Sequence, residues 1–306
     1  MVKSNLTIGV CVRNCMKTLP DAIESILCQD YPHELMQVVF VDDGSDDETL
    51  SVIKSYVPKM DVKVEVFHHK WRGLGYTRNV VVANAEGDFI LWVDGDMAFS
   101  KDFMSKLVKF IEQHPKSGIV KGNLSLESGE NLLATLETYS RAANIMRDYA
   151  SEKAQFKAFG TGGAIYRVEA INQVGGFNDR ISGYGEDFDI EYRIRKAGWL
   201  LSPTDVQFRD YERGKVSWKD LWCKYIKRGY DSYRFTRERK RHLNVYAMLP
   251  PGAFLAGLFN SFKIYKKINK KVAFLLPLQY VFKLSAWCVG FIKASSNSKR
   301  VSVKAK

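Results

Sequence analysis

Short apolar runs alternate with segments of helical spacing along the first hundred residues. The runs are rich in Val, Ile, Leu and Phe, which favour β-strands, and they cover residues 6–12, 37–42, 62–67 and 89–94. In residues 19–27 and 47–57, apolar positions recur at intervals of three and four, as on a helix with one buried side. This alternation predicts an α/β fold with a mostly parallel sheet.

Acidic residues end two of these predicted strands. Asp42 and Asp43 follow the second run, and Asp94, Gly95 and Asp96 follow the fourth. Turn formation and helix capping could explain either group alone. However, ligands of parallel sheets bind at the carboxyl ends of the strands, and Mg²⁺ is commonly held by one or two carboxylates plus substrate phosphates. Two acidic strand ends therefore indicate a diphosphate site with Mg²⁺ or Mn²⁺, which Gly95 would let approach the backbone.

The charge distribution separates a neutral body from a basic tail. The 306 residues carry a net charge of +12, but residues 245–306 contain 11 Lys or Arg and no acidic residue. The first 244 residues are almost neutral, which argues against a nucleic-acid partner. The five cysteines form no CxxC pair, which favours reduced thiols in the cytosol, and we expect no signal peptide.

The acidic strand ends belong to a wider set of motifs, and through these the chain resembles the family 2 glycosyltransferases over roughly residues 5–235. These are inverting enzymes with the GT-A fold, a Rossmann-like sheet with helices on both faces, that use nucleotide-diphospho-sugars. Several motifs carry the resemblance in the right order: VFVDDGSDDET at 39–49, GLGYTRN at 73–79, DGD at 94–96, GTGGAIYRVEAINQVGGF at 160–177 and GEDFDIEYRIRKAG at 185–198. Two positions outside these motifs depart from the family pattern, namely Arg13 and Trp71, and inside GLGYTRN Thr77 stands in place of the usual Ala.

The resemblance implies a role for each matched residue. The donor-binding residues would be Asp42, Asp43, Arg78, Asp94, Gly162 and Gly163. Asp94 and Asp96 would hold the metal, with Asp210 a weaker third ligand because this chain lacks the His that many members carry there. Asp187 would be the catalytic base and Glu186 its neighbour, since inversion requires a carboxylate that takes the proton of the acceptor hydroxyl. Acids of a first helical turn are the simpler explanation of Glu186 and Asp187, and both explanations can hold.

The C-terminal part has the pattern of a membrane-associated segment. Residues 217–241 combine an aromatic stripe with many Lys and Arg, and two apolar stretches follow at 245–262 and 272–292. We expect a catalytic domain at 1–215 and membrane-associated helices at 216–306. The lysines between the stretches conflict with two spans, which favours helices on the cytoplasmic leaflet. A soluble helical cap and a single span by 272–292 are the alternatives.

The sequence therefore predicts a glycosyltransferase on the cytoplasmic face of the cell membrane. It would transfer a sugar from a nucleotide-diphospho-sugar to a hydroxyl of a glycan or lipid-linked acceptor. One alternative is a polyprenyl-phosphate sugar synthase, in which the phosphate attacks and no base is needed. Others are a phosphohydrolase and a non-catalytic membrane subunit that retains the fold.

Overall fold

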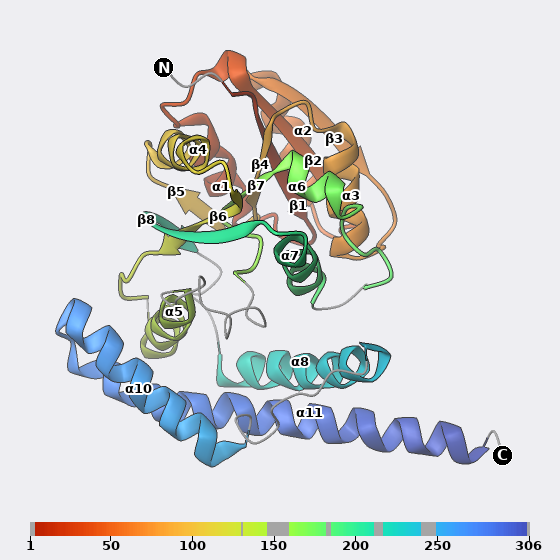
Figure 1. The fold of residues 1–306 in the computed structure, drawn as a ribbon, viewed down its shortest axis with the longest axis vertical. Coiled ribbons are helices and arrows are strands. Elements are labelled where there is room, and N and C mark those ends of the chain that lie inside the picture. Colours follow the sequence, from red (N-terminus) through yellow and green to blue (C-terminus); the bar gives the residue numbers. More distant parts are fainter. Residues whose placement is uncertain are drawn as a thin grey trace. The chain divides into compact units, whose positions relative to one another are not determined.

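An eight-stranded sheet forms the centre of the first part of the chain in the computed structural model (Figure 1). The strands are β1 (Leu6–Val12), β2 (Met36–Asp42), β3 (Lys63–His68), β4 (Phe89–Val93), β5 (Met97–Phe99), β6 (Ser117–Leu124), β7 (Ala164–Arg167) and β8 (Leu200–Asp210). Their order in the sheet is β3-β2-β1-β4-β7-β6-β8-β5. The structure describes residues 4–129, 131–145, 159–181, 185–210, 217–239 and 249–304.

The chain divides into two compact units. Unit 1 is Met1–Ser125 with Ile145–Glu212, and unit 2 is Leu126–Asn144 with Arg213–Lys306. The α-helices of unit 1 are α1 (Leu19–Leu27), α2 (Thr49–Tyr56), α3 (Leu74–Asn84), α4 (Phe103–Gln113), α6 (Val168–Gln173) and α7 (Glu186–Lys196). Unit 2 is built from α5 (Leu132–Ile145), α8 (Trp218–Arg239), α10 (Pro250–Ile268), the short 3-10 helix η5 (Lys271–Leu275) and α11 (Leu276–Lys304).

The sheet has a parallel half and a mixed half. Strands β3, β2, β1 and β4 are parallel neighbours, as the alternating pattern predicts. Beyond β4, β7 is antiparallel to both β4 and β6, β8 is parallel to β6, and β5 is antiparallel to β8. The predicted α/β fold is confirmed, and the run of consecutive parallel strands is confined to β3, β2, β1 and β4.

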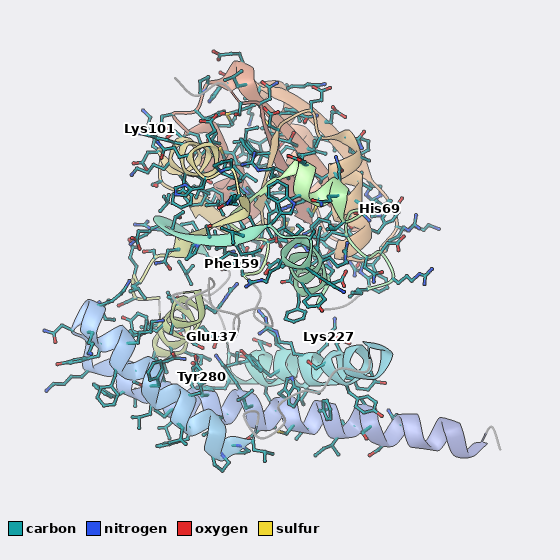
Figure 2. The ribbon with its side chains drawn as sticks, in the orientation of Figure 1. His69, Lys101, Glu137, Phe159, Lys227 and Tyr280 are labelled. Atoms are coloured by element: carbon teal, nitrogen blue, oxygen red, sulfur yellow. The ribbon has the colours of Figure 1, made fainter. Side chains whose placement is uncertain are left out.

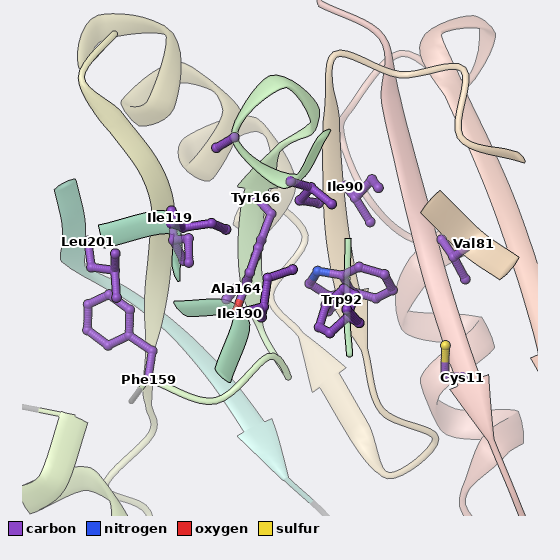
Figure 3. Close-up of a cluster of buried hydrophobic side chains, with 14 of the residues drawn as sticks. Cys11, Val81, Ile90, Trp92, Ile119, Phe159, Ala164, Tyr166, Ile190 and Leu201 are labelled. Atoms are coloured by element: carbon purple, nitrogen blue, oxygen red, sulfur yellow. The ribbon is translucent and has the colours of Figure 1, made fainter. Parts of the chain in front are cut away.

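The core of unit 1 lies on both faces of this sheet. Every residue of β1, β2 and β4 is buried, so helices must cover both faces, as is usual for parallel strands. Figure 3 shows one of the resulting clusters, in which Trp92 of β4 lies beside Tyr166 of β7. The Trp92 ring meets Tyr166 and Phe177 edge to face, at centroid distances of 6.3 and 5.4 Å. This packing fixes the end of β4, directly before Asp94.

Unit 2 contains a buried ion pair between helices. Lys283 of α11 donates hydrogen bonds to Glu137 and Ser140 of α5, both at 2.8 Å, and Gln279 donates to Glu137 at 2.8 Å. Figure 2 shows Glu137 on α5 and Tyr280 on α11. Within the described residues, one helical segment, Lys271–Asn297, has the length and composition of a membrane span.

Candidate functional site

Three parallel strands bring the predicted acidic residues to one edge of the sheet. Val12 at the end of β1 pairs with Asp42 at the end of β2, and the Asp43 N–H donates to the Val12 carbonyl at 2.9 Å. On the other side of β1, Val10 pairs with Val93, the last residue of β4. Asp43 and Asp94 therefore follow the ends of the two strands that flank β1, at the edge where parallel sheets bind ligands.

Gly95 is packed more tightly than the sequence suggests. A Cβ atom at this position would lie 2.7 Å from the Cys15 sulfur and 3.0 Å from a Val12 methyl group. The side of Gly95 on which a Cβ would lie is therefore filled by Val12 and Cys15. Gly95 serves the close packing of the turn between β4 and β5.

Asp42 holds the turn that follows its own strand. Its Oδ1 accepts hydrogen bonds from the N–H and the hydroxyl of Ser45, at 3.1 and 2.5 Å. Its Oδ2 lies 2.9 Å from Nδ1 of His68, the residue that pairs with Asp42 in the sheet. Both carboxylate oxygens of this fully buried residue thus contact protein groups.

Asp43 fixes the start of α3. Its two oxygens accept the N–H groups of Arg72 and Gly73, at 2.7 and 3.0 Å, and Nδ1 of His69 lies 3.4 Å away. Sequence reasoning missed the roles of His68 and His69. The signal was available, because β3 pairs with β2 and its last residues must lie beside the paired aspartates.

Arg78 forms a buried ion pair with Glu186. Its Nη1 donates to Oε1 of Glu186, and both side chains are 5% exposed. The guanidinium also lies over the rings of Trp92 and Phe177, at 5.9 and 5.6 Å from their centroids. Burial lowers the pKa of Arg78, but the charges of Glu186 and other groups outweigh it and raise that pKa above its ordinary value. Arg78 therefore joins α3 to α7 as a permanent cation.

The loop before β7 lies beside two of the predicted site residues, Asp94 and Asp187. A methyl group at Gly162 would overlap the Asp94 carboxylate, and one at Gly160 would lie 3.6 Å from Oδ2 of Asp187. Gly163 has a φ of +69°, and a Cβ there would lie 2.8 Å from the ring of Phe208. The loop thus connects the DGD segment at the end of β4 with the start of α7.

Two buried charged residues hold this loop, and sequence reasoning missed both. Lys121 of β6 donates hydrogen bonds to the carbonyls of Gly160 and Gly162. Glu191 of α7 accepts the N–H groups of Phe159 and Gly160, at 2.6 and 2.8 Å. Burial, followed by the charge of Asp187, raises the pKa of Glu191 to about 8. The only signals in the sequence are a lysine inside an apolar strand and a second acid one turn after Asp187.

The electrostatics of Cys11 confirm that these groups share one region. Burial raises the pKa of the Cys11 thiol to about 12, and the charges of Asp94, Asp43 and Glu186 add to the effect while Arg78 opposes it. Asp94 and Asp187 also act on the charge of Arg78. The structure therefore gathers the residues of four separate sequence motifs around the ends of β1 and β4.

The three acids that the sequence predicts as metal ligands form a looser group. Asp94 and Asp96 are half-buried, and Asp210 at the end of β8 pairs with Met97, the residue after Asp96. Within the described ranges, no three His, Cys, Asp or Glu side chains gather closely enough to hold a metal ion. Such an arrangement suits an ion that takes its remaining ligands from substrate phosphates, as Mg²⁺ usually does.

The two departures from the family pattern contact each other. The guanidinium of Arg13 lies 5.6 Å from the ring centroid of Trp71, which is 53% exposed. Arg13 also donates to the Gly44 carbonyl at 3.2 Å. The cation and the aromatic ring therefore lie next to the turn that Asp42 holds, and they contact each other there.

Comparison with known proteins agrees with the geometry. A family model described as Glycosyl transferase family 2 matches residues 7–175, more than half of the chain. The poly(ribitol-phosphate) beta-N-acetylglucosaminyltransferase TarS of Staphylococcus aureus is 36% identical over 101 residues, which are 33% of this chain and 18% of that protein. The match thus spans less than a fifth of that relative.

Solved structures share the fold at low sequence identity. The mannosyltransferase PcManGT from Pyrobaculum calidifontis, in complex with GDP-Man and Mn²⁺, superposes with a TM-score of 0.60 at 17% identity and covers 99% of this chain and 80% of its own. TarS residues 1–349 of S. aureus in complex with UDP-GlcNAc give a TM-score of 0.54 at 16% identity, covering 96% and 92%. These likenesses confirm the predicted glycosyltransferase fold.

Proposed function

The chain belongs to glycosyltransferase family 2, and from this we propose that it transfers a sugar from a nucleotide-diphospho-sugar to an acceptor hydroxyl, with inversion at the anomeric carbon. One observation carries the proposal: the loop Gly160–Gly163 lies beside Asp94 at one end and Asp187 at the other. The donor phosphates and the acceptor hydroxyl would meet at this loop. The neighbours bound to GDP-Man and UDP-GlcNAc support the donor class.

Asp187 is the proposed base. It is half-buried in the first turn of α7, where its Oδ1 accepts the N–H of Phe188 at 2.7 Å. In the proposed reaction, Asp187 takes the proton of the acceptor hydroxyl while the oxygen of that hydroxyl attacks the anomeric carbon. The bond to the diphosphate breaks, and the diphosphate leaves with the electron pair. The adjacent Glu186 keeps the start of α7 in place through Arg78.

The donor set fits Mg²⁺ or Mn²⁺. Asp94 and Asp96, with Asp210 across the strand pair, offer only carboxylate oxygens, which are the ligands these ions prefer. When bound, such an ion would stabilise the negative charge of the leaving diphosphate. The Mn²⁺ in the PcManGT complex supports this assignment.

Transfer assays with the full chain test the base. UDP-GlcNAc and GDP-mannose serve as probe donors, with release of the nucleoside diphosphate as the readout. We expect Asp187→Asn to lower turnover by about 10²–10⁴-fold while the affinity for UDP or GDP changes little. Asp179→Asn, an exposed acid of unit 1, is the matched control and should keep wild-type turnover. Unchanged turnover of Asp187→Asn would refute the base assignment. If the variant also transfers sugar to a polyprenyl phosphate, the result would favour a lipid-phosphate sugar synthase.

Nucleotide binding with and without metal tests the ligands. Asp96→Ala should weaken Mn²⁺-dependent binding of UDP or GDP and leave the weaker metal-free binding unchanged. Equal affinity of the wild-type protein with Mn²⁺ and with EDTA would contradict the metal site. Absence of transfer and of donor hydrolysis under all conditions would instead indicate a non-catalytic subunit.

A further inference from the structure

Helix α10 buries mainly small and polar residues, with Ile264 the one large apolar side chain among them, and exposes four large apolar ones. Gly257, Asn260 and Ser261 are buried inside unit 2, and Asn260 donates to the Tyr280 hydroxyl at 2.8 Å. The large apolar side chains on the other side are 43 to 71% exposed: Phe254, Leu255, Phe259 and Phe262. This arrangement is the reverse of an ordinary surface helix, whose apolar stripe faces the core.

The exposed apolar surface continues onto the neighbouring helices. Phe262 of α10 meets Phe274 of η5 edge to face, with ring centroids 5.3 Å apart. Leu278, one turn further along in α11, is 65% exposed. We call Phe254, Leu255, Phe259, Phe262, Phe274 and Leu278 the apolar patch. Contiguous exposed apolar surfaces of this kind mark binding sites for proteins or membranes.

Positive charge borders the apolar patch. Lys266, Lys267, Lys270 and Lys271 lie at the turn between α10 and η5, and all four are exposed. The sequence has no acidic residue between 245 and 306, and Lys270 donates a hydrogen bond to Ser128 at 2.9 Å. Apolar side chains next to exposed lysines are complementary to a surface with an apolar interior and anionic headgroups.

The ion pair inside unit 2 argues against a membrane span by α11. Lys283 lies in the middle of the apolar segment Lys271–Asn297, and it is 4% exposed because it contacts Glu137 and Ser140 of α5. Burial lowers the pKa of Lys283, but Tyr225 and Glu137 outweigh it and keep the residue charged. A span by α11 alone would place this charge in lipid without its partner, which is costly.

We propose that the apolar patch and the adjacent lysines bind unit 2 to the surface of an anionic membrane, with α10 lying in the headgroup zone and α11 not crossing the bilayer. The cytoplasmic leaflet presents such a surface. The proposal requires no transfer activity, so it stands or falls separately from the proposed reaction.

Vesicle flotation of the full chain tests the proposal. Vesicles of phosphatidylcholine alone are compared with vesicles that also contain phosphatidylglycerol. We expect strong binding only to the anionic vesicles. Lys266→Gln/Lys267→Gln/Lys271→Gln should weaken it by about fivefold per lysine, from about 1 kcal/mol each. The matched control is Lys101→Gln/Lys109→Gln on unit 1, where both residues are exposed, and it should bind normally.

A second pair of variants tests the apolar contribution. Leu255→Ser/Phe259→Ser should lower binding to anionic vesicles by tenfold or more, since about 25 cal/mol is gained per Å² of apolar area buried. Leu200→Ser removes an exposed leucine of unit 1, 51% exposed against 65% for Leu255, and should have no effect. The substituted side chains are solvent-exposed, so circular dichroism should show unchanged folding.

Three results would overturn the proposal. The first is equal or absent binding to both kinds of vesicle. The second is self-association in sedimentation that Leu255→Ser/Phe259→Ser abolishes, because a second copy would then cover the patch. The third is resistance of the membrane-bound protein to extraction by alkaline carbonate, which would show that α11 spans the bilayer.

Discussion

Replacement of Arg78 by Met would break the buried ion pair that joins α3 to α7. Both side chains of the pair are 5% exposed, so Glu186 would be left buried without its cation. Loss of one partner of a buried pair costs about 3–5 kcal/mol. In domains of about 150–250 residues each kcal/mol lowers Tm by about 2–4 °C, so we expect a loss of about 6–20 °C.

The cost should depend on pH. Burial and the adjacent Asp187 raise the pKa of Glu186, and Arg78 is the group that opposes them. Without Arg78, Glu186 would retain a proton in the folded state at higher pH than in the unfolded state. A carboxyl group whose pKa is higher in the folded than in the unfolded state makes the fold less stable as pH rises between these two pKa values. The destabilisation by Arg78→Met should therefore be smaller at pH 5 than at pH 8.

Urea unfolding of the full chain, followed by circular dichroism at both pH values, measures these effects. Arg78→Met/Glu186→Leu removes both charges and should be much closer to wild type than Arg78→Met alone, because replacement of a whole buried pair by apolar groups is often neutral. Arg180→Met, an exposed arginine of unit 1, is the control. A loss below about 1 kcal/mol for Arg78→Met at both pH values would refute the structural role. If the stable double variant also binds UDP normally, Arg78 makes no essential phosphate contact.

Two further predictions concern the loop before β7. Burial raises the pKa of Glu191 from 4.5 to about 8, so the free energy of unfolding should fall as pH rises through this window, by up to about 1.4 kcal/mol per unit. Glu191→Gln should flatten this slope in urea titrations between pH 5 and 8, and an identical slope would contradict the assignment. Gly162→Ala should lower the transfer activity strongly while Tm changes little, because the added methyl group would displace the Asp94 carboxylate. Wild-type turnover of Gly162→Ala would show that this contact is unimportant.

The local pattern predicts the parallel half of the sheet almost residue by residue. The runs at 6–12 and 37–42 correspond to β1 and β2 within one residue, because a strand buried on both faces must be apolar throughout. The mixed half has no such pattern. Strand β5 has three residues and β7 has four, which is too short for an apolar run to stand out.

The pairing of buried charges is the part of the structure that the sequence does not reveal. Arg78 and Glu186 are 108 residues apart, and Glu137 and Lys283 are 146 apart. Each of these residues fits a surface helix when taken alone, and only the folded chain shows that it is buried and paired. Motifs locate residues of a site, whereas the pairing of buried charges depends on long-range packing.

Burial separates the motif acids into two groups. Asp42 and Asp43 are buried, and the oxygens of both already accept bonds from neighbouring backbone or hydroxyl groups. An acid held in this way is positioned to order the turn after β2 and the start of α3, and a bound nucleotide would meet the loops that they order. Asp94 and Asp187 are half-buried and lie on either side of the Gly160–Gly163 loop. In the proposed reaction these two residues carry the chemistry, and Lys121 and Glu191 matter because they hold the loop between them.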